Sequence, residues 1–405
     1  MLSKKIIALS AAAMLSVFAV CQGCKTEEPV ITDPDEHKDS TAVVESITDS
    51  IDWKVVEGKD QVVLLIRRNS WKELETEITR YKEEVEARFP VQLNILRGSW
   101  SKPSEVRKTI AKISETKGLS GVVLVGDMPL HRFFMHGFAN PDALYYEDFT
   151  LKFSHDEIAS SYSGRPDPKV WVANLRAVSD PNERGIAELK AFFAKTHAYY
   201  SGEQVIRHRA LYAAGWEWPD GAKEAASAME SVFPGPARSL LINETGKAST
   251  AEHLGATRTN ILNAFKENYT FYYVQVHSWE AGHDVDHGGQ ILAPEIAALQ
   301  TGALLTINHG CSAGNWLKAN PAVNTSQAYV FGQGIGQAVV CQVRTGMVYG
   351  HEHMYERLVA GDYAGKAYLA AKRAGEEEMY RDYPDGTIFS GVTFIGNPFI
   401  YIQAE

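Results

Sequence analysis

Cysteine is scarce in this 405-residue sequence, which contains four in all. Two of them, Cys21 and Cys24, lie in the N-terminal segment, so only Cys311 and Cys341 remain in the rest of the chain. Two cysteines cannot build a disulfide framework, and the fold must therefore depend on a hydrophobic core. Hydrophobic residues make up 45% of the sequence, which is enough for such a core.

Positive charge and long apolar runs are also in short supply. Lys and Arg number 40 against 50 Asp and Glu, which gives a net charge of −10. This balance argues against nucleic acid as a partner and against a basic membrane-binding face. The N-terminal apolar run, residues 6–20, is shorter than the roughly 20 residues that a membrane-spanning helix needs.

The first 24 residues are typical of a lipoprotein signal. A basic start, Met1–Lys5, precedes the apolar run, and Gly23 stands just before Cys24. We expect Cys24 to carry the lipid, with Cys21 as the alternative, and residues 25–50 to be an acidic, disordered tether. The sequence thus predicts a lipid-anchored protein of the bacterial cell envelope, at the outer membrane, on its periplasmic or its surface side.

Strands and helices alternate after the tether. Residues 61–66, 91–96, 121–125 and 170–173 are β-rich apolar runs, and residues 71–89, 104–116 and 182–200 have helical periodicity. The alternation restarts with strands at 210–214, 239–242, 270–276, 303–308 and 336–342, and with helices at 221–232, 250–268, 351–360 and 365–375. We therefore expect an α/β protein with a mostly parallel sheet, helices on both faces, and two halves, 51–203 and 204–405.

A histidine and a cysteine follow two of the predicted strands. The run Thr270–Val276 ends at His277, and the run Ala303–Asn308 is followed by His309, Gly310 and Cys311. In an open α/β sheet the carboxyl ends of the strands form the crevice where ligands bind. A thiol and an imidazole placed there are what a cysteine nucleophile and its general base require. The alternative is a buried thiol and a histidine that caps a strand.

Several ordered segments carry a resemblance to a known family. They are Val122–Asp127, Pro141–Tyr146, Lys169–Asn174, the helix through Lys195 and Tyr199-Tyr200, Val276–Trp279, Asn308–Cys311 and Ile395–Pro398. In this order they resemble the segments of gingipain-like cysteine peptidases of the caspase-like clan. The resemblance covers roughly residues 60–400, and it implies a caspase-like three-layer α/β/α sandwich.

The resemblance also implies a reaction. Cys311 would attack a peptide carbonyl while His277 protonates the leaving amine. The backbone N–H groups of Ser278 and Cys311 would form the oxyanion hole. The substrate would be a peptide or protein, and no cofactor would be needed.

The sequence departs from the family at three places, and the first two favour a second hypothesis, a binding protein or pseudopeptidase. Ser278 stands where the family has Gly after the catalytic histidine, and Gly reaches backbone conformations that Ser reaches only at a cost. Lys169 and Asp167 are the nearest residues where the family places an acidic partner for the histidine. Ala173-Asn174 replaces the family's Gly-Arg, so a preference for basic residues cannot be carried over.

The segment after His277 is rich in possible metal ligands. His283, Asp284, Asp286 and His287 suggest a third hypothesis, a metal-dependent hydrolase, although their spacing fits no common zinc motif. The oxygen ligands of this loop would also suit a structural Ca²⁺. A solvated loop, or one that binds substrate, is the alternative.

Further aromatic and acidic residues are candidates for binding substrate. Trp279 and Glu280 follow His277, and Trp216-Glu217-Trp218 follows the strand at 210–214, where Glu217 is suited to pair with a basic side chain. Among the other histidines, His309 ranks second as the base because it lies two residues from Cys311. We expect packing, solvated or capping roles for His136, His351 and His353, and a core position for Cys341.

Overall fold

The computed structural model describes residues 53–135, 137–177, 183–243, 255–286, 288–317 and 323–403. The predicted signal, the lipidation site and the predicted tether lie outside these residues, as do His136 and His287. Within the described ranges, no helix is both long and apolar enough to cross a membrane.

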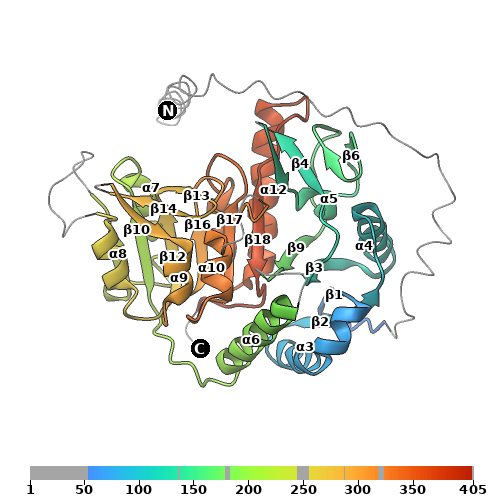
Figure 1. The fold of residues 1–405 in the computed structure, drawn as a ribbon, viewed down its shortest axis with the longest axis horizontal. Coiled ribbons are helices and arrows are strands. Elements are labelled where there is room, and N and C mark those ends of the chain that lie inside the picture. The colour runs from blue at the N-terminus through green and yellow to red at the C-terminus, as the bar shows by residue number, and fades with distance from the viewer. Residues whose placement is uncertain are drawn as a thin grey trace. The chain divides into compact units, whose positions relative to one another are not determined.

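A ten-stranded sheet runs through the molecule in the order β11-β10-β12-β16-β17-β18-β9-β3-β1-β2 (Figure 1). All neighbouring strands in it are parallel except β17 and β18, which are antiparallel. The strands are β1 (Asp60–Arg67), β2 (Val91–Gly98), β3 (Leu119–Val125), β9 (Trp171–Leu175), β10 (Ala210–Ala214), β11 (Arg238–Leu241), β12 (Tyr269–Gln275), β16 (Ala303–Asn308), β17 (Ala338–Gln342) and β18 (Val392–Gly396).

Helices cover both faces of this sheet because its strands are apolar on both sides. In β1, Val62, Leu64 and Ile66 pack in one core cluster, whereas Val63 and Leu65 pack in another. The first cluster includes side chains of α3 (Arg68–Arg88), α6 (Glu183–Tyr200), α7 (Pro219–Ala228), α11 (His351–Val359) and α12 (Ala364–Asp382). The opposite face packs against α4 (Pro103–Lys117) and α5 (Leu144–Glu147) at one end, and against α8 (Arg258–Ala264), α9 (Ala293–Ala298) and α10 (Thr325–Phe331) at the other. The predicted α/β class with helices on both faces is confirmed.

The helix pattern follows from residue spacing. Leu74, Ile78, Tyr81 and Val85 of α3 are all buried, and their three- and four-residue spacing places them on one face of the helix. Helix α4 begins at Pro103, where a missing N–H costs nothing, and is followed by Gly118 at φ +66°.

The C-terminal strand joins the strands of the two halves of the sequence. β18 pairs with β17 on one side and with β9 on the other. The strands β2, β1, β3 and β9 therefore lie together at one end of the sheet, and those from the second half of the sequence lie together at the other (Figure 1).

Two sequence predictions need correction. The helix expected over 250–268 is only α8, seven residues long, and residues 244–254 are outside the described ranges. The segment after β12, expected as loop, is a strand of a small antiparallel sheet, because the turn at Glu280-Ala281 lets it fold back on itself. The strands of this small sheet are β13 (His277–Trp279), β14 (Gly282–Val285) and β15 (Gly289–Leu292).

Five other short strands lie outside the large sheet. They are β4 (Arg132–Met135), β5 (Phe138–Pro141), β6 (Lys152–Phe153), β7 (Ile158–Ala159) and β8 (Tyr162–Ser163), and a 3₁₀ turn covers Gly235–Ala237.

Candidate active site

The segments after β12 and β16 lie side by side. The two strands are neighbours in the sheet, and the N–H of His309 donates to the carbonyl of Val274 at 2.9 Å. A Cβ atom on Gly310 would lie 2.0 Å from the hydroxyl oxygen of Ser278, so only glycine fits there. The residue before Cys311 thus contacts the residue after His277.

Backbone groups hold the Cys311 loop against the end of β17. Cys311 is a free, half-buried thiol, and the N–H of Gly346 points to its sulfur at 3.4 Å. The next residue, Ser312, has a left-handed backbone with φ +54°, and its N–H donates to the carbonyl of Arg344 at 2.8 Å. These two contacts fix the position of the Cys311 loop relative to the segment that follows β17.

His277 is exposed and is paired with a carboxylate. Its Nε2 lies 2.6 Å from Oε2 of Glu217, and its ring packs edge-on against Trp218 with a centroid separation of 4.7 Å. A carboxylate only accepts hydrogen bonds, so Nε2 carries the proton and Nδ1 is left with the lone pair in the neutral ring. Among the described residues no hydrogen bond joins His277 to Cys311, and Glu217 is the only side chain that hydrogen-bonds the imidazole.

The turn that carries Glu217 is held in place by hydrogen bonds of the two residues that precede Glu217. The N–H of Gly215 donates to the carbonyl of Gln275 at 2.9 Å, which ties the turn to the end of β12. The N–H of Trp216 donates to Oδ1 of the buried Asp286 at 3.0 Å. Asp286, a candidate metal ligand by sequence, therefore anchors the turn that brings Glu217 to His277.

Ser278 is held by a buried histidine. Its hydroxyl lies 2.6 Å from Nδ1 of His283, and Nε2 of His283 lies 3.0 Å from the hydroxyl of Tyr329 on α10. Burial lowers the pKa of His283 from 6.5 to about 4, so the ring is neutral at pH 7. A chain of three polar groups thus fixes the side chain of the residue that replaces the family's glycine.

The candidate metal ligands point to different partners. His283 contacts Ser278 and Tyr329, Asp284 accepts from the amide of Gln290 at 2.7 Å, and Asp286 holds the turn at Trp216. No group of three or more His, Cys, Asp or Glu side chains suited to a metal occurs among the described residues, which do not include His287. Calcium at this loop stays an untested prediction.

The other predicted residues fall into two groups. Trp216 is 37% exposed, and Trp279 and Glu280 are half-buried beside His277, with backbone carbonyls that accept from Thr325 at the start of α10. These side chains are accessible to a substrate. By contrast, His309 is 3% exposed and burial lowers its pKa well below the ordinary value, so it is poorly placed as the base.

Three further predictions concern residues outside the pair itself. Cys341 is fully buried in β17, and burial raises the pKa of its thiol to about 12, which confirms its core position. Lys169 and Asp167 form an exposed ion pair with each other. The acidic partner of His277 is Glu217, which the sequence offered only as a substrate-binding residue able to pair with a basic side chain.

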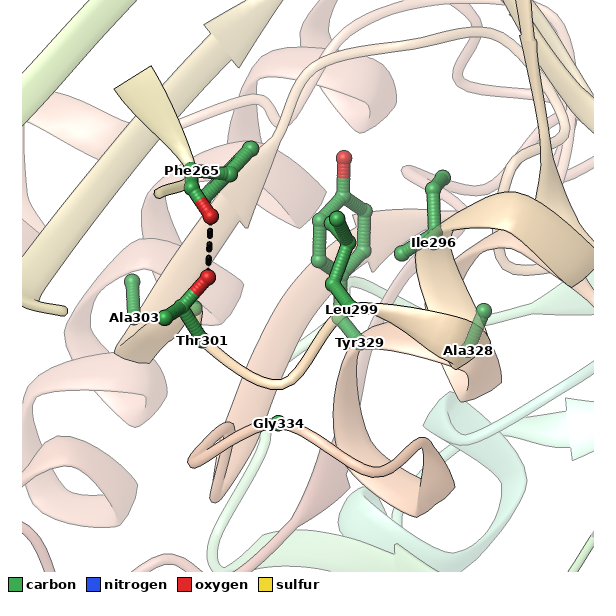
Figure 2. Close-up of a pocket in the computed structure, with 9 residues that line it drawn as sticks. Phe265, Ile296, Leu299, Thr301, Ala303, Ala328, Tyr329 and Gly334 are labelled. Atoms are coloured by element: carbon green, nitrogen blue, oxygen red, sulfur yellow. Dashed lines mark hydrogen bonds between the residues drawn. The ribbon is translucent and has the colours of Figure 1, made fainter. Parts of the chain in front are cut away.

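The enclosed space near α10 is not the reaction site. Figure 2 shows a cavity bounded by Phe265, Ile296, Leu299 and Tyr329, with the hydroxyl of Thr301 bonded to the carbonyl of Phe265. Its volume of about 10 Å³ is close to the minimum for one water molecule. This space is too small for the side chain of a peptide.

Comparison with known proteins shows a likeness of fold. No protein-family model matches the chain, and no curated protein matches it in sequence. Among solved structures it is similar to the crystal structure of gingipain R (RGPB), described as an Arg-specific cysteine proteinase, with 15% sequence identity and a TM-score of 0.58. The match covers 86% of this chain and 80% of the other. At that identity the likeness is one of fold, and the chain has the caspase-like α/β fold of gingipain R, as the resemblance in its sequence predicts.

Proposed function

We propose that this protein is a cysteine endopeptidase in which Cys311 is the nucleophile and His277 the general acid and base. The observation that carries the proposal is the contact between the two strand-end segments. Gly310 touches Ser278, which places a half-buried thiol and an exposed imidazole on adjacent segments at the carboxyl edge of the sheet. The caspase-like fold shared with a cysteine proteinase supports the same reading.

The proposed reaction uses only side chains and backbone groups of this chain. The Cys311 thiolate forms a bond to the substrate carbonyl carbon, and the backbone N–H groups of Ser278 and Cys311 stabilise the oxyanion. The C–N bond then breaks while protonated His277 gives its proton to the leaving amine. Neutral His277 next takes a proton from water as the water oxygen attacks the thioester. The C–S bond then breaks, which restores the Cys311 thiolate and protonated His277, and the acid product leaves and loses its proton to solvent.

Glu217 supplies the acidic support that the sequence does not place beside β9. Its Oε2 accepts a hydrogen bond from the Nε2–H of His277, with an N–O distance of 2.6 Å. This bond holds the tautomer in which Nδ1 is the basic nitrogen. It also stabilises the imidazolium that forms during proton transfer.

Alkylation and substitution test the proposal together. We expect iodoacetamide treatment and Cys311→Ala each to abolish cleavage of a denatured protein substrate. Cys341→Ala is the matched control, because its thiol is buried and cannot react. Cleavage that survives Cys311→Ala would refute the thiol mechanism, and additional loss with a chelator would support the metal-dependent alternative.

A pseudopeptidase is the second candidate, and two observations favour it. Ser278 occupies the family's glycine position, and the imidazole of His277 bonds Glu217 and not the thiol. Stoichiometric alkylation of Cys311 with no turnover across a broad peptide library would support this candidate over the first.

We further propose that the protein is exported and anchored to the bacterial envelope through a lipid on Cys24. The basic start, the apolar run and the small residue before Cys24 support this. In a bacterial host given an alkyne-tagged fatty acid, the full chain should become labelled. Cys24→Ser should abolish the label, while Cys21→Ser should retain it; the reverse result would assign the lipid to Cys21.

A further inference from the structure

Arg344 is a buried cation with no carboxylate partner in the part of the chain that the structure describes. The residue is 7% exposed, and its guanidinium donates to the carbonyls of Phe389 and Thr345 at 2.7 and 2.6 Å and to the sulfur of Met379 at 3.1 Å. None of the ion pairs among the described residues includes it. Three of its five N–H groups are thus used, one of them on a weak sulfur acceptor, and the charge itself is not neutralised.

This charge lies on the segment that touches the thiol. The N–H of Gly346, two residues beyond Arg344, contacts the sulfur of Cys311, and the carbonyl of Arg344 accepts from Ser312. A Cβ atom on Gly346 would lie 3.3 Å from Nη1 of Arg344 and 3.1 Å from the hydroxyl of Tyr349. Two polar donors therefore meet at Gly346, whose own N–H contacts the sulfur of Cys311.

An unpaired buried cation is costly, and an anion bound beside it would offset that cost. Taking a guanidinium out of water without a counter-charge costs several kcal/mol in general. The ring of Tyr349 lies under the guanidinium at 5.2 Å and offsets part of that cost. A carboxylate that reached the two donors at Gly346 would complete the site with charge-assisted hydrogen bonds.

We propose that Arg344 and Tyr349 bind an acidic side chain, Asp or Glu, on the substrate residue whose carbonyl Cys311 attacks. The inference rests on the proposed peptidase function and adds its substrate class. A basic side chain at this position is repelled by Arg344. The amide side chains Asn and Gln have the same shape and would fit, but they leave Arg344 without a counter-charge. Peptides that carry them should therefore be poorer substrates.

Matched peptides test the substrate class. A set of fluorogenic tetrapeptides that differ only in the residue before the cleaved bond would carry Asp, Asn, Glu, Gln, Ala, Lys or Arg there. We expect kcat/KM for the better acid to exceed that of its amide by about 100-fold, and Lys and Arg to be the poorest. Cysteine-dependent cleavage without a preference for the acids would overturn this inference and leave the proposed function in place.

Variants of Arg344 assign the preference to this residue. Arg344→Gln should reduce the acid-to-amide ratio to near 1, and Arg344→Lys should retain part of it because the charge remains. Tyr349→Phe should lower it by about 10-fold, the effect of one hydrogen bond to a charged group. Arg207→Gln, an exposed arginine paired with Glu267, is the control and should leave the ratio unchanged. Circular dichroism checks that each variant is folded.

A binding measurement keeps the inference testable if turnover is absent. Product peptides ending in Asp, Glu, Asn or Gln would be titrated into Cys311→Ala by fluorescence anisotropy. The better acid should bind at least about 10-fold more tightly than its amide, and Arg344→Gln should remove the difference. Equal affinities for acid and amide would refute the acidic subsite whether or not the protein is an enzyme.

Discussion

Two acid–base clusters in this fold differ in their access to water. The pair formed by His277 and Glu217 stands at the strand ends, with side chains 62% and 36% exposed. The second cluster joins Lys372 of α12 to Glu147 at 3.4 Å and to Glu376 at 3.0 Å, and all three side chains are fully buried. Exposure lets the first pair exchange protons with solvent and substrate, whereas burial makes the second a fixed connection between helices.

Losing one member should therefore affect different properties in the two clusters. At the exposed pair, we expect His277→Ala to lower kcat/KM by about 10⁴-fold because proton transfer is lost. The midpoint of thermal unfolding should stay unchanged, since the ring is largely in solvent. Steady-state kinetics and a thermal melt check both halves of the prediction. A loss below 10-fold would remove His277 from the mechanism.

In the buried cluster, we expect Lys372→Met to lower the free energy of unfolding by about 3–5 kcal/mol, because two carboxylates are left without their cation. Urea unfolding measures the change. Lys366→Met on the same helix is the matched control. Its exposed pairs with Asp60 and Asp362 should contribute less than about 1 kcal/mol. Similar losses for the two variants would show that burial does not separate the clusters.

The buried cluster should also respond to pH. Desolvation raises the pKa of Glu147 from 4.5 to about 7, in spite of the nearby Lys372. Between these values the folded state holds a proton that the unfolded state has lost, so stability falls as pH rises from 4.5 to 7 and then levels off. The pKa of Lys372 is raised as well, so its contribution is lost only above its ordinary value of 10.5.

The difference between the protein and Glu147→Gln isolates this response. We expect the variant to lack the fall in stability, which amounts to about 3 kcal/mol at most. Urea unfolding at pH 5, 6, 7 and 8 measures it. Parallel curves for the two proteins would mean that Glu147 does not titrate in this range.

The smallest effect is expected at Glu217, which acts through His277. Glu217→Gln should lower kcat by about 10- to 30-fold and leave KM unchanged, because the carboxylate orients the imidazole and does not touch substrate. Glu230→Gln, an exposed glutamate paired with Arg238, serves as the control. A rise in KM with kcat unchanged would instead assign Glu217 to substrate binding.

The fold was largely predictable because its strands are buried on both faces. Runs such as 61–66 and 303–308 are continuous and apolar, and they read as strands without alternation. The small sheet β13-β14-β15 could not be read in this way. His277, Ser278, His283 and Asp284 are polar, and the turn at Glu280-Ala281 brings their strands together.

The site was predictable where it depends on strand order and not where it depends on loops. Neighbouring strands place His277 and Cys311 at one edge, which follows from their positions after β12 and β16. The contact between His277 and Glu217 spans 60 residues and depends on how Asp286 holds the turn at Trp216. One signal was present: Glu217 also follows a strand, β10, that neighbours β12 in the sheet.

The position of β18 has a consequence for the order of folding. This strand comes from Val392–Gly396, near the end of the chain, yet it lies in the interior of the sheet between β17 and β9. The two groups of strands can each form first, but they have no common hydrogen-bonded ladder until Val392–Gly396 lies between them. Closure joins β9 to a strand more than 200 residues later, and such long-range pairing is slow. Until β18 pairs with both neighbours, the edges of β17 and β9 remain open to other chains.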